Sequence, residues 1–444
     1  MDYTALAEQV VATARSRGAD AAEAYLQAGR TLSIEVRNGS LETVQEAASQ
    51  GIGVRVFVQG RMAFASCNDL APASVDAAVA RAIEFARATT ADPSNVLPTD
   101  KGTTPVDGLY DASLEQVTMA RKIELATRLE ALAMKAKGIT KSDGATYGER
   151  ESRIFLANSN GLSKTYASSS CSLGVSIVAE KGEQRSSGGE RCGRRFFADL
   201  DKPEAIAAKA AARAIEALDP RMVKTQRVAV IVDPDVAGSF IGGILQAING
   251  ERVLQRASFL GTMLNQKIGS DLFTLTDDGT RAKGLASAPF DGEGVPTQKR
   301  VLVEKGVLKG FIYNTAVAKR AGVTSTGNAA RGGFSSLPSI GVHNIVMAAG
   351  TTPPGEIVKS TKVGLWLRGV TGYGINPVNG NFSGGASGLW VENGQAAFPV
   401  KGLTIAATAA EILNGIDLAG TDVDLNDTMA APMFRIREMQ VGGE

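Results

Sequence analysis

One stretch near the C-terminal end of the chain is crowded with glycine, asparagine and small hydroxyl residues. It runs from Gly369 to Val400, and its densest part is Ser383-Gly384-Gly385-Ala386-Ser387-Gly388. Because glycine and asparagine adopt positive φ at little steric cost, this composition predicts tightly specified turns. Such turns leave backbone N–H and C=O groups without side-chain cover, so that these groups can face a ligand. The alternative is a set of ordinary turns that only connect strands.

Metal chemistry is limited by the number of histidines. His343 is the only histidine among the 444 residues. A catalytic zinc ion normally takes three protein ligands, most often including two or more histidines, so this chain cannot build the usual site. We therefore predict no metal site and no catalytic residue in this chain. His343 lies in the alternating stretch Gly341–Met347, and we interpret it as a structural or surface histidine.

Other hydrolase templates find no match in the sequence. No Gly-x-Ser-x-Gly elbow is present. A Ser-His-Asp triad would have to use His343, and nothing near that residue has the expected context. Cys171 lies in a serine-rich stretch and would act as a nucleophile only together with the same histidine. A hydrolase that works alone would therefore need an unrecognised nucleophile.

A long pattern within the glycine-rich stretch resembles one protein family. Residues 372–394 read Gly-x-Gly-Ile-Asn-Pro-Val-x-Gly-Asn-Phe-Ser-x-Gly-Ala-Ser-Gly-Leu-Trp-Val-Glu-Asn-Gly, followed by Pro399-Val400 and Leu403-Thr404-Ile405-Ala406. This pattern resembles the TldD/PmbA family, and more closely its PmbA branch, also called TldE. The resemblance extends over essentially the whole chain. It implies a two-protein, zinc-dependent peptidase in which TldD-type chains carry the metal motif and PmbA-type chains usually lack it.

The family comparison also identifies where a metal motif would stand. TldD-type chains carry His-Glu-x-x-x-His on the helix that corresponds to Ser239–Ile248. Matched residue by residue, this chain has Leu245 at the first histidine, Gln246 at the glutamate and Gly250 at the second histidine. None of the three supplies an imidazole, and Gln246 cannot act as a general base. We expect no cofactor in this chain and a zinc ion in a TldD-like partner.

The glycine-rich stretch is our candidate binding site. We expect it to line a cleft that holds an extended peptide by backbone hydrogen bonds, as in strand addition. The expected lining residues are Asn376, Asn379, Asn381, Ser383, Gly384, Gly385 and Ser387. The expected protein partner is a TldD-like subunit or a second copy of this chain. Two alternatives stay open: a stand-alone or homodimeric hydrolase, and a non-enzymatic binding module, in keeping with the family's label as a modulator of DNA gyrase.

Composition and charge are ordinary for a soluble protein. The formal net charge is +1, so no overall field attracts the chain to nucleic acid or to a membrane. The N-terminus has neither a basic nor an apolar signal region, and no apolar run approaches the roughly 20 residues that span a bilayer. The three cysteines form no disulfide framework. We therefore expect a cytoplasmic protein that binds no membrane and no nucleic acid.

The N-terminal half of the sequence predicts a duplication. Helical and strand patterns recur at a nearly constant offset: Ile34 corresponds to Ile154, and Gly53 corresponds to Gly174. We predict two copies of a helix–antiparallel sheet–helix unit, at residues 1–110 and 111–222. The basic, glycine-rich segment Gly182–Arg195 is predicted to be a loop of undefined role.

Residues 223–444 predict a different architecture. A long amphipathic helix contains the degenerate metal motif and breaks near Asn249-Gly250, and many short strands with turn signals follow it. Asn393-Gly394 predicts a two-residue hairpin turn. The fold class is therefore α+β: a duplicated N-terminal helix–sheet region, then a β-rich barrel- or sandwich-like domain with one long helix.

Overall fold

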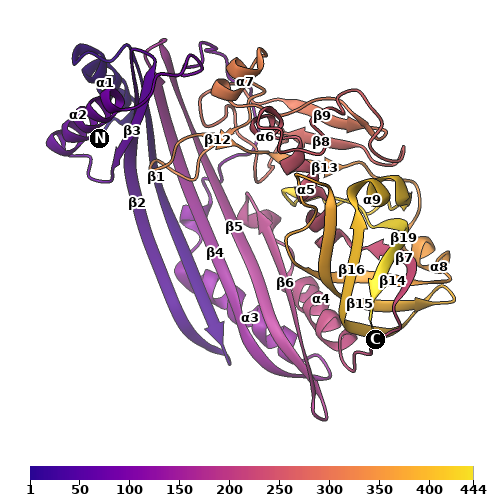
Figure 1. Cartoon of the computed structure of the whole chain (residues 1–444). Helices are drawn as coiled ribbons and strands as arrows, with labels where there is room; N and C mark the ends of the chain where they lie inside the picture. The colour runs from indigo at the N-terminus through magenta and orange to yellow at the C-terminus, as the bar shows by residue number, and fades with distance from the viewer. Residues whose placement is uncertain (444) are drawn as a thin grey trace.

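A computed structural model describes residues 1–443 of the chain. Its N-terminal half is built on one antiparallel sheet with the strand order β3-β2-β1-β4-β5-β6 (Figure 1). The strands are long, and several of them curve across the whole height of the molecule. Their bounds are β1 (Ala21–Arg37), β2 (Ser40–Val58), β3 (Arg61–Cys67), β4 (Ile139–Asn158), β5 (Leu162–Lys181) and β6 (Gln184–Arg194).

The order of elements in this half repeats. Each copy consists of a helix, three consecutive strands and a second helix, and the copies join where β1 pairs with β4. The helices pack on the sheet through apolar side chains at helical spacing, and two separate hydrophobic cores result. The two predicted ranges therefore share one continuous sheet. The helices are α1 (Tyr3–Ser16), α2 (Pro72–Ala88), α3 (Met119–Met134) and α4 (Pro203–Glu216).

The prediction that Gly182–Arg195 forms a loop is wrong. Its residues form strand β6, which pairs with β5 from Lys181↔Gln184 to Cys171↔Arg194. The glycines there serve packing rather than a flexible loop, because a β-carbon at Gly188 would overlap the backbone of helix α4 at Ala214. A glycine-rich sequence with charged neighbours resembles a loop, although here it allows a helix to lie close to a strand.

The C-terminal part contains a closed barrel of five strands. Their order is β16-β15-β14-β7-β19, and a further pairing between β16 and β19 closes the barrel. The predicted hairpin is confirmed, since Asn393 and Gly394 both have positive φ between the paired residues Glu392 and Gln395. The bounds are β7 (Gln226–Val232), β14 (Val363–Thr371), β15 (Asn381–Glu392), β16 (Gln395–Thr408), β19 (Phe434–Gly442) and, at the edge, β17 (Ile416–Ala419).

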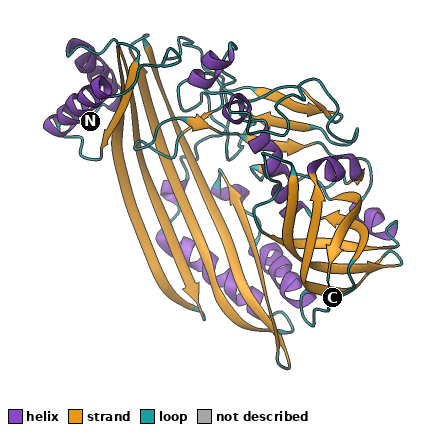
Figure 2. Cartoon of the chain, in the orientation of Figure 1, coloured by secondary structure: helices purple, strands orange, loops and turns teal. Residues whose placement is uncertain are grey.

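A second sheet of five short strands lies next to the barrel (Figures 1 and 2). Its order is β10-β9-β8-β13-β18, and a separate two-stranded ladder joins β11 to β12. The strands are β8 (Leu275–Asp278), β9 (Lys299–Glu304), β10 (Val307–Leu308), β11 (Ala329–Ala330), β12 (Ser339–Ile340), β13 (Asn344–Met347) and β18 (Met429–Ala430). The helices of this half are α5 (Gly238–Ala247), α6 (Gly250–Leu254), α7 (Thr315–Ala321), α8 (Pro354–Lys359) and α9 (Ala409–Gly415). The predicted α+β class with a β-rich C-terminal domain is confirmed.

Helix α5 packs its apolar face against the barrel strands. Phe240 stacks against Phe382 of β15, with ring centroids 4.8 Å apart, and meets Phe434 of β19 edge-on. The apolar face predicted for this helix is buried in the main hydrophobic core together with both barrel strands. Among residues 1–443, no helix is both long and apolar enough to cross a membrane.

A buried ion network connects the N-terminal sheet to the C-terminal part. Arg55 of β2 donates to Glu23 of β1 at 2.8 Å and to Glu293 at 3.0 Å. Arg331 also pairs with Glu23. All four side chains are at most 5% exposed. Because buried charges are tolerated only when they are paired, this network fixes the two parts against each other.

Candidate functional site

The helix with the degenerate metal motif ends where the sequence predicts. Helix α5 stops at Ala247, and Asn249 begins α6 as its N-cap, accepting a hydrogen bond from the Glu251 N–H at 3.0 Å. The N–H of Gly250 donates to the Ile312 carbonyl at 2.9 Å, which ties the break to the neighbouring chain segment. The three metal-motif positions therefore lie on either side of a rigid kink.

The side chains at these positions do not fit a zinc ion. Leu245 is 5% exposed and belongs to the main hydrophobic core. A β-carbon at Gly250 would overlap the ring of Tyr313, so the space that a ligand side chain would need is filled. Gln246 is exposed, and its Oε1 accepts a hydrogen bond from Arg252 at 3.4 Å. Within residues 1–443, no three His, Cys, Asp or Glu side chains cluster as a metal site.

The metal-motif helix and the predicted binding stretch are in direct contact. Residues 372–380 form the loop between β14 and β15, and Ile375 of this loop is buried against Gly243 of α5. A β-carbon at Gly374 would lie 2.5 Å from the Ser239 carbonyl oxygen. The close approach requires glycine on both segments, and it places the loop against the first and middle turns of α5.

Two of the predicted binding residues build the loop itself. The Asn376 side chain accepts a hydrogen bond from the Val378 N–H at 2.9 Å, and the Asn379 side chain accepts one from the Asn381 N–H at 3.0 Å. Both side chains are nevertheless exposed. Their oxygens are therefore occupied by turn formation, and the amide nitrogens face solvent.

The remaining predicted residues lie on a barrel strand and not in a loop, which corrects our prediction of tight turns throughout the stretch. On β15, Phe382 and Ala386 point into the core, while Asn381 and Ser383 are exposed. Ser387 lines a cavity of about 450 Å³ together with β6. A β-carbon at Gly384 would lie 2.7 Å from the Thr371 carbonyl oxygen, so this glycine allows two strands to approach.

Strand addition at this position does not agree with the pairing of β15. Gly385 pairs with Thr371 on one side and with Thr404 on the other, and Ala386 is likewise paired on both sides. Backbone groups that already bond to neighbouring strands are not free for a peptide. That these residues contact a peptide stays a prediction, and the groups they offer are the exposed side chains of Asn381 and Ser383.

Exposed apolar side chains lie on the 372–380 loop and at the end of α6. Tyr373 and Val378 on the loop are 106% and 53% exposed, and Leu254 at the end of α6 is 42% exposed. Phe259 lies between these two segments, because its N–H donates to the Pro377 carbonyl at 3.0 Å. We call Leu254, Phe259, Tyr373 and Val378 the loop–helix surface. Its individual residues follow no periodic pattern in the sequence, so sequence reasoning did not find it.

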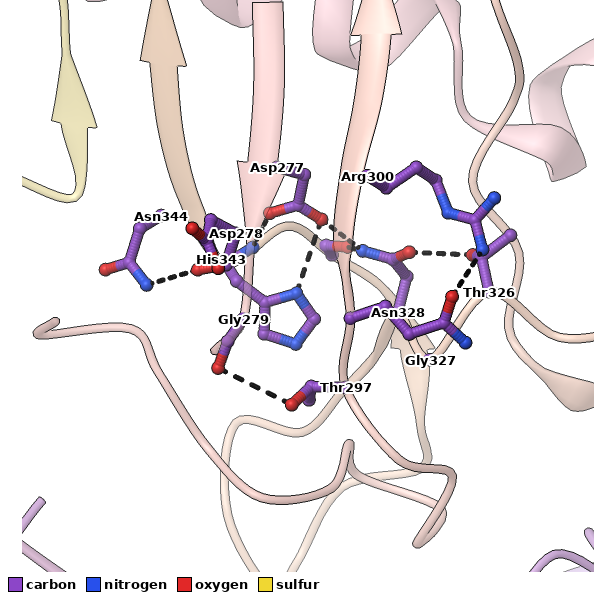
Figure 3. A network of polar contacts seen from close by, with 12 residues as sticks. Asp277, Asp278, Gly279, Thr297, Arg300, Thr326, Gly327, Asn328, His343 and Asn344 are labelled. Carbon is purple, nitrogen blue, oxygen red and sulfur yellow. Dashed lines mark hydrogen bonds and ion pairs between the residues drawn. The ribbon is translucent and has the colours of Figure 1, made fainter. Parts of the chain in front are cut away.

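His343 belongs to a structural network (Figure 3). The backbone N–H of His343 donates to Asp277 at 2.7 Å, and Nδ1 of its ring lies 3.3 Å from the other oxygen of that carboxylate. Asn328 donates to the same carboxylate at 2.7 Å. The nearby Thr297 hydroxyl is bound to the carbonyls of Gly279 and Ala288. Asp277 thus holds three chain segments together, and the ring meets no activated hydroxyl.

Cys171 is equally unsuited to nucleophilic chemistry. Its side chain is buried on β5, and burial together with the nearby Glu149 carboxylate raises the pKa of the thiol to about 12. The reactive form of cysteine is the thiolate, so the group is inert at neutral pH.

Two Asp-x-Asp pairs, Asp233/Asp235 and Asp422/Asp424, meet at one cavity, although we expected no Asp-x-Asp ligand loop from the sequence. Asp233 and Asp235 line it from one side, and Asp422, Asp424 and Asp427 line it from the other, in a volume of about 740 Å³. Arg368 donates to Asp233 at 2.8 Å, and Arg213 pairs with Asp235. Asp233 and Asp235 are thus balanced by arginines, and among residues 1–443 the carboxylates do not converge on a cation position.

A larger cavity lies between the N-terminal sheet and the C-terminal part. It has a volume of about 800 Å³ and is lined by hydroxyl groups of β5, among them Ser168, Ser170 and Ser172, and by Arg150 and Arg191. This cavity contains none of the predicted binding residues. The sequence signal for it is the alternation of serines in Ser168–Ser172.

Comparison with known proteins defines a class that agrees with this geometry. Three family models match in order: the PmbA/TldA metallopeptidase domain 1 over residues 22–86, the central domain over residues 112–218 and the C-terminal domain over residues 225–443. The chain belongs to the PmbA/TldD metallopeptidase family.

Individual relatives match over nearly their whole lengths. The metalloprotease PmbA of Escherichia coli O157:H7 is 31% identical over 98% of this chain and 96% of its own. The structure of TldE from Thermococcus kodakarensis superposes with a TM-score of 0.90 at 25% identity, covering 99% of this chain and 100% of that one. A proposed modulator of DNA gyrase from Bacteroides thetaiotaomicron gives 0.92 at 28% identity, with both chains fully covered. These matches support a protease-related role at the level of the family.

Proposed function

We propose that this chain is the non-catalytic, TldE-like subunit of a zinc peptidase, and that it works with a TldD-like partner that carries the metal. The observation that carries the proposal is the state of the metal-motif helix. Leu245 is part of the hydrophobic core, and the position of Gly250 is covered by Tyr313, while the helix and its kink remain. A chain with this helix would shape the site around it and would not perform the hydrolysis itself.

The loop–helix surface is the part of this chain that we expect to face the partner. It exposes an aromatic ring and aliphatic side chains on the loop that packs against α5 and at the end of α6, and aromatic side chains are typical anchors of protein interfaces. Burying Tyr373 and Val378 against a partner would bring the degenerate motif next to the partner's zinc. The peptide would then lie between the two chains.

Substrate contact is assigned to side chains of the barrel strand. Asn381 and Ser383 are exposed on β15 next to the loop, and an amide and a hydroxyl both bond to peptide groups without selecting one side chain. We propose that they help to orient an extended peptide toward the partner's metal. The partner's zinc-bound water would perform the attack, with a glutamate of the partner as general base.

Reconstitution tests the proposal. The purified chain, a TldD-like protein from the same organism and their mixture are each assayed against an unfolded peptide. We expect cleavage only by the mixture, and one zinc per pair by elemental analysis, located in the partner. Tyr373→Ala/Val378→Ser should abolish co-purification, and Val363→Ser, an exposed apolar residue elsewhere, serves as the control.

The same assay separates the alternatives. Cleavage by this chain alone, or a stoichiometric zinc ion in it, would contradict the proposal and favour a stand-alone hydrolase. Stable association without cleavage in any combination would favour a binding module. The geometry around His343 and Cys171 gives no support to a stand-alone nucleophile.

A further inference from the structure

Strand β2 has a long free edge. From Ser40 to Gly51 it pairs only with β1, because its other neighbour, β3, begins to pair at Ile52. All residues from Ser40 to Gln50 are exposed. Figure 1 shows β2 continuing far beyond the short β3 along the outer side of the sheet. A row of unpaired backbone N–H and C=O groups therefore faces solvent.

This edge has little of the usual protection. Natural sheets block free edges with charged side chains, especially lysine, or with proline, bulges or a covering segment, and here only Glu42 and Glu46 are charged. Residues 40–51 contain no lysine and no proline, and the apolar Leu41 and Val44 are 47% and 42% exposed. The only irregularity lies at the start, where the register shifts between Glu35 and Val36 of β1. From Thr43 onward the edge is regular.

The corresponding edge in the second repeat is covered. There β6 pairs with β5 only from Cys171 onward, and the linker between the repeats runs beside the remaining part of β5. The Ser169 N–H donates to the Leu109 carbonyl at 2.9 Å, and Lys164 donates to the Asp100 carbonyl at 3.2 Å. The chain thus covers one edge of this kind with its own backbone and leaves its counterpart on β2 bare.

We propose that Thr43–Ala47 of β2 pairs antiparallel with the same residues of a second copy of this chain. Antiparallel pairing of two identical edges requires a two-fold axis perpendicular to the sheet, the commonest symmetry of homo-oligomers. The helix-covered faces of both copies then lie on the same side. The chain already contains a joint of this type, because its two repeats meet edge to edge at β1 and β4.

Charge excludes the two registers next to the proposed one. With Gln45 on the axis, Thr43 lies opposite Ala47 and Val44 lies opposite Glu46, so no two glutamates face each other. Centring the pair on Val44 would place Glu42 opposite Glu46, and centring it on Glu46 would place that residue opposite itself. Like charges directly opposite each other destabilise a sheet. The proposal therefore predicts individual residue pairs, and these distinguish a second copy from an unrelated partner.

Sedimentation equilibrium of the purified chain, with no other protein present, tests the proposal. The native protein should have twice the 46.1 kDa chain mass at micromolar concentration. Thr43→Lys/Ala47→Lys places lysine opposite lysine twice across the axis, and the dimer dissociation constant should rise at least about tenfold. Thr43→Lys/Ala47→Glu places opposite charges at the same positions and should restore the dimer.

Ser33→Lys is the matched control. Ser33 is exposed on β1, pairs with Gln45 and lies one strand inside the edge, so this variant should remain dimeric. Circular dichroism of each variant verifies that it is folded. A native monomer, a double-lysine variant that remains dimeric, or a lysine–glutamate variant that stays dissociated would each overturn the proposal. None of these measurements depends on peptidase activity. The dimer proposal can therefore fail while the proposed function holds, and the proposed function can fail while the dimer proposal holds.

Discussion

At Gly250 the absence of a side chain is a packing requirement. The Tyr313 ring covers this residue, and Leu245 one turn earlier fills core space. The positions matched to the metal motif are therefore filled by core packing and by a neighbouring ring, in addition to lacking histidines. The role of Gln246 differs, since its side chain is exposed and contacts only Arg252.

The stability of the motif helix should depend on its buried face. Ile244→Ala removes a fully buried side chain between helix and barrel, and we expect it to lower the free energy of unfolding by about 2–5 kcal/mol. Gln246→Ala should change it by less than about 0.5 kcal/mol, because that side chain is exposed. Urea denaturation measures both, and an equal loss for the two variants would contradict the burial that we describe.

Gln246 should also be dispensable for catalysis. In a complex with a TldD-like partner, Gln246→Ala should leave the peptidase rate within about a factor of three, which corresponds to less than about 1 kcal/mol. Glutamate→alanine in the partner's own metal motif should abolish the rate. A hundredfold loss for the folded Gln246→Ala complex would show that this chain contributes chemistry directly.

At the scale of elements, the sequence patterns located the helices and hairpins but not the strand lengths. The alternating run Leu32–Val36 predicts a short strand, while β1 extends from Ala21 to Arg37. Alternation marks a strand only where one face is buried and the other exposed. Most of β2 is exposed on both faces, and much of β1 near Ala24 is buried on both faces. Neither part therefore shows the alternation of apolar and polar residues that predicts a strand.

The contact between the glycine-rich stretch and the motif helix was not predictable from the sequence. The glycine pattern indicated a specialised segment, and the structure places its 372–380 part against α5. Glycines that permit close strand approach and glycines that permit turns have the same sequence appearance, so β15 was read as a loop. The loop–helix surface combines chain segments more than 100 residues apart, which meet where the Phe259 N–H donates to the Pro377 carbonyl, and no local pattern reports such a contact.

Substitutions on β15 should separate structure from binding. A β-carbon at Gly385 would overlap the Thr371 hydroxyl, so Gly385→Val should lower the free energy of unfolding by about 1–3 kcal/mol. Ser383→Ala, on the exposed face, should leave stability unchanged and raise the KM of the reconstituted peptidase. Urea titration and steady-state kinetics of both variants test this. An unaltered KM for Ser383→Ala would remove that hydroxyl from the binding site.

At the scale of the whole molecule, the ion network at the centre of the sheet decides whether the two halves hold together. Arg55→Leu would leave Glu23 and Glu293, both fully buried, without this counter-charge. Removing one partner of a buried pair destabilises by about 3–5 kcal/mol. Arg17→Leu is the control, because Arg17 pairs with Asp76 where the two side chains are 39% and 50% exposed, and its loss should be below about 1 kcal/mol. Similar losses for the two variants, measured by thermal unfolding, would contradict the structural role of the network.

The joint between β1 and β4 has a consequence for biosynthesis. Its register pairs Glu23 with Asn158 and Val36 with Ala145. Every β4 residue is therefore synthesised more than 100 residues after the β1 residue with which it pairs. At a ribosomal rate of about 5–20 residues per second, the inner edge of β1 remains without its strand for roughly 5–25 seconds. During that interval the sheet of the first repeat has unpaired backbone groups along β1 on one side and along the free part of β2 on the other. Nascent chains on one messenger would then be able to pair with each other before their own second repeat arrives, which makes this step a natural point for a chaperone to act.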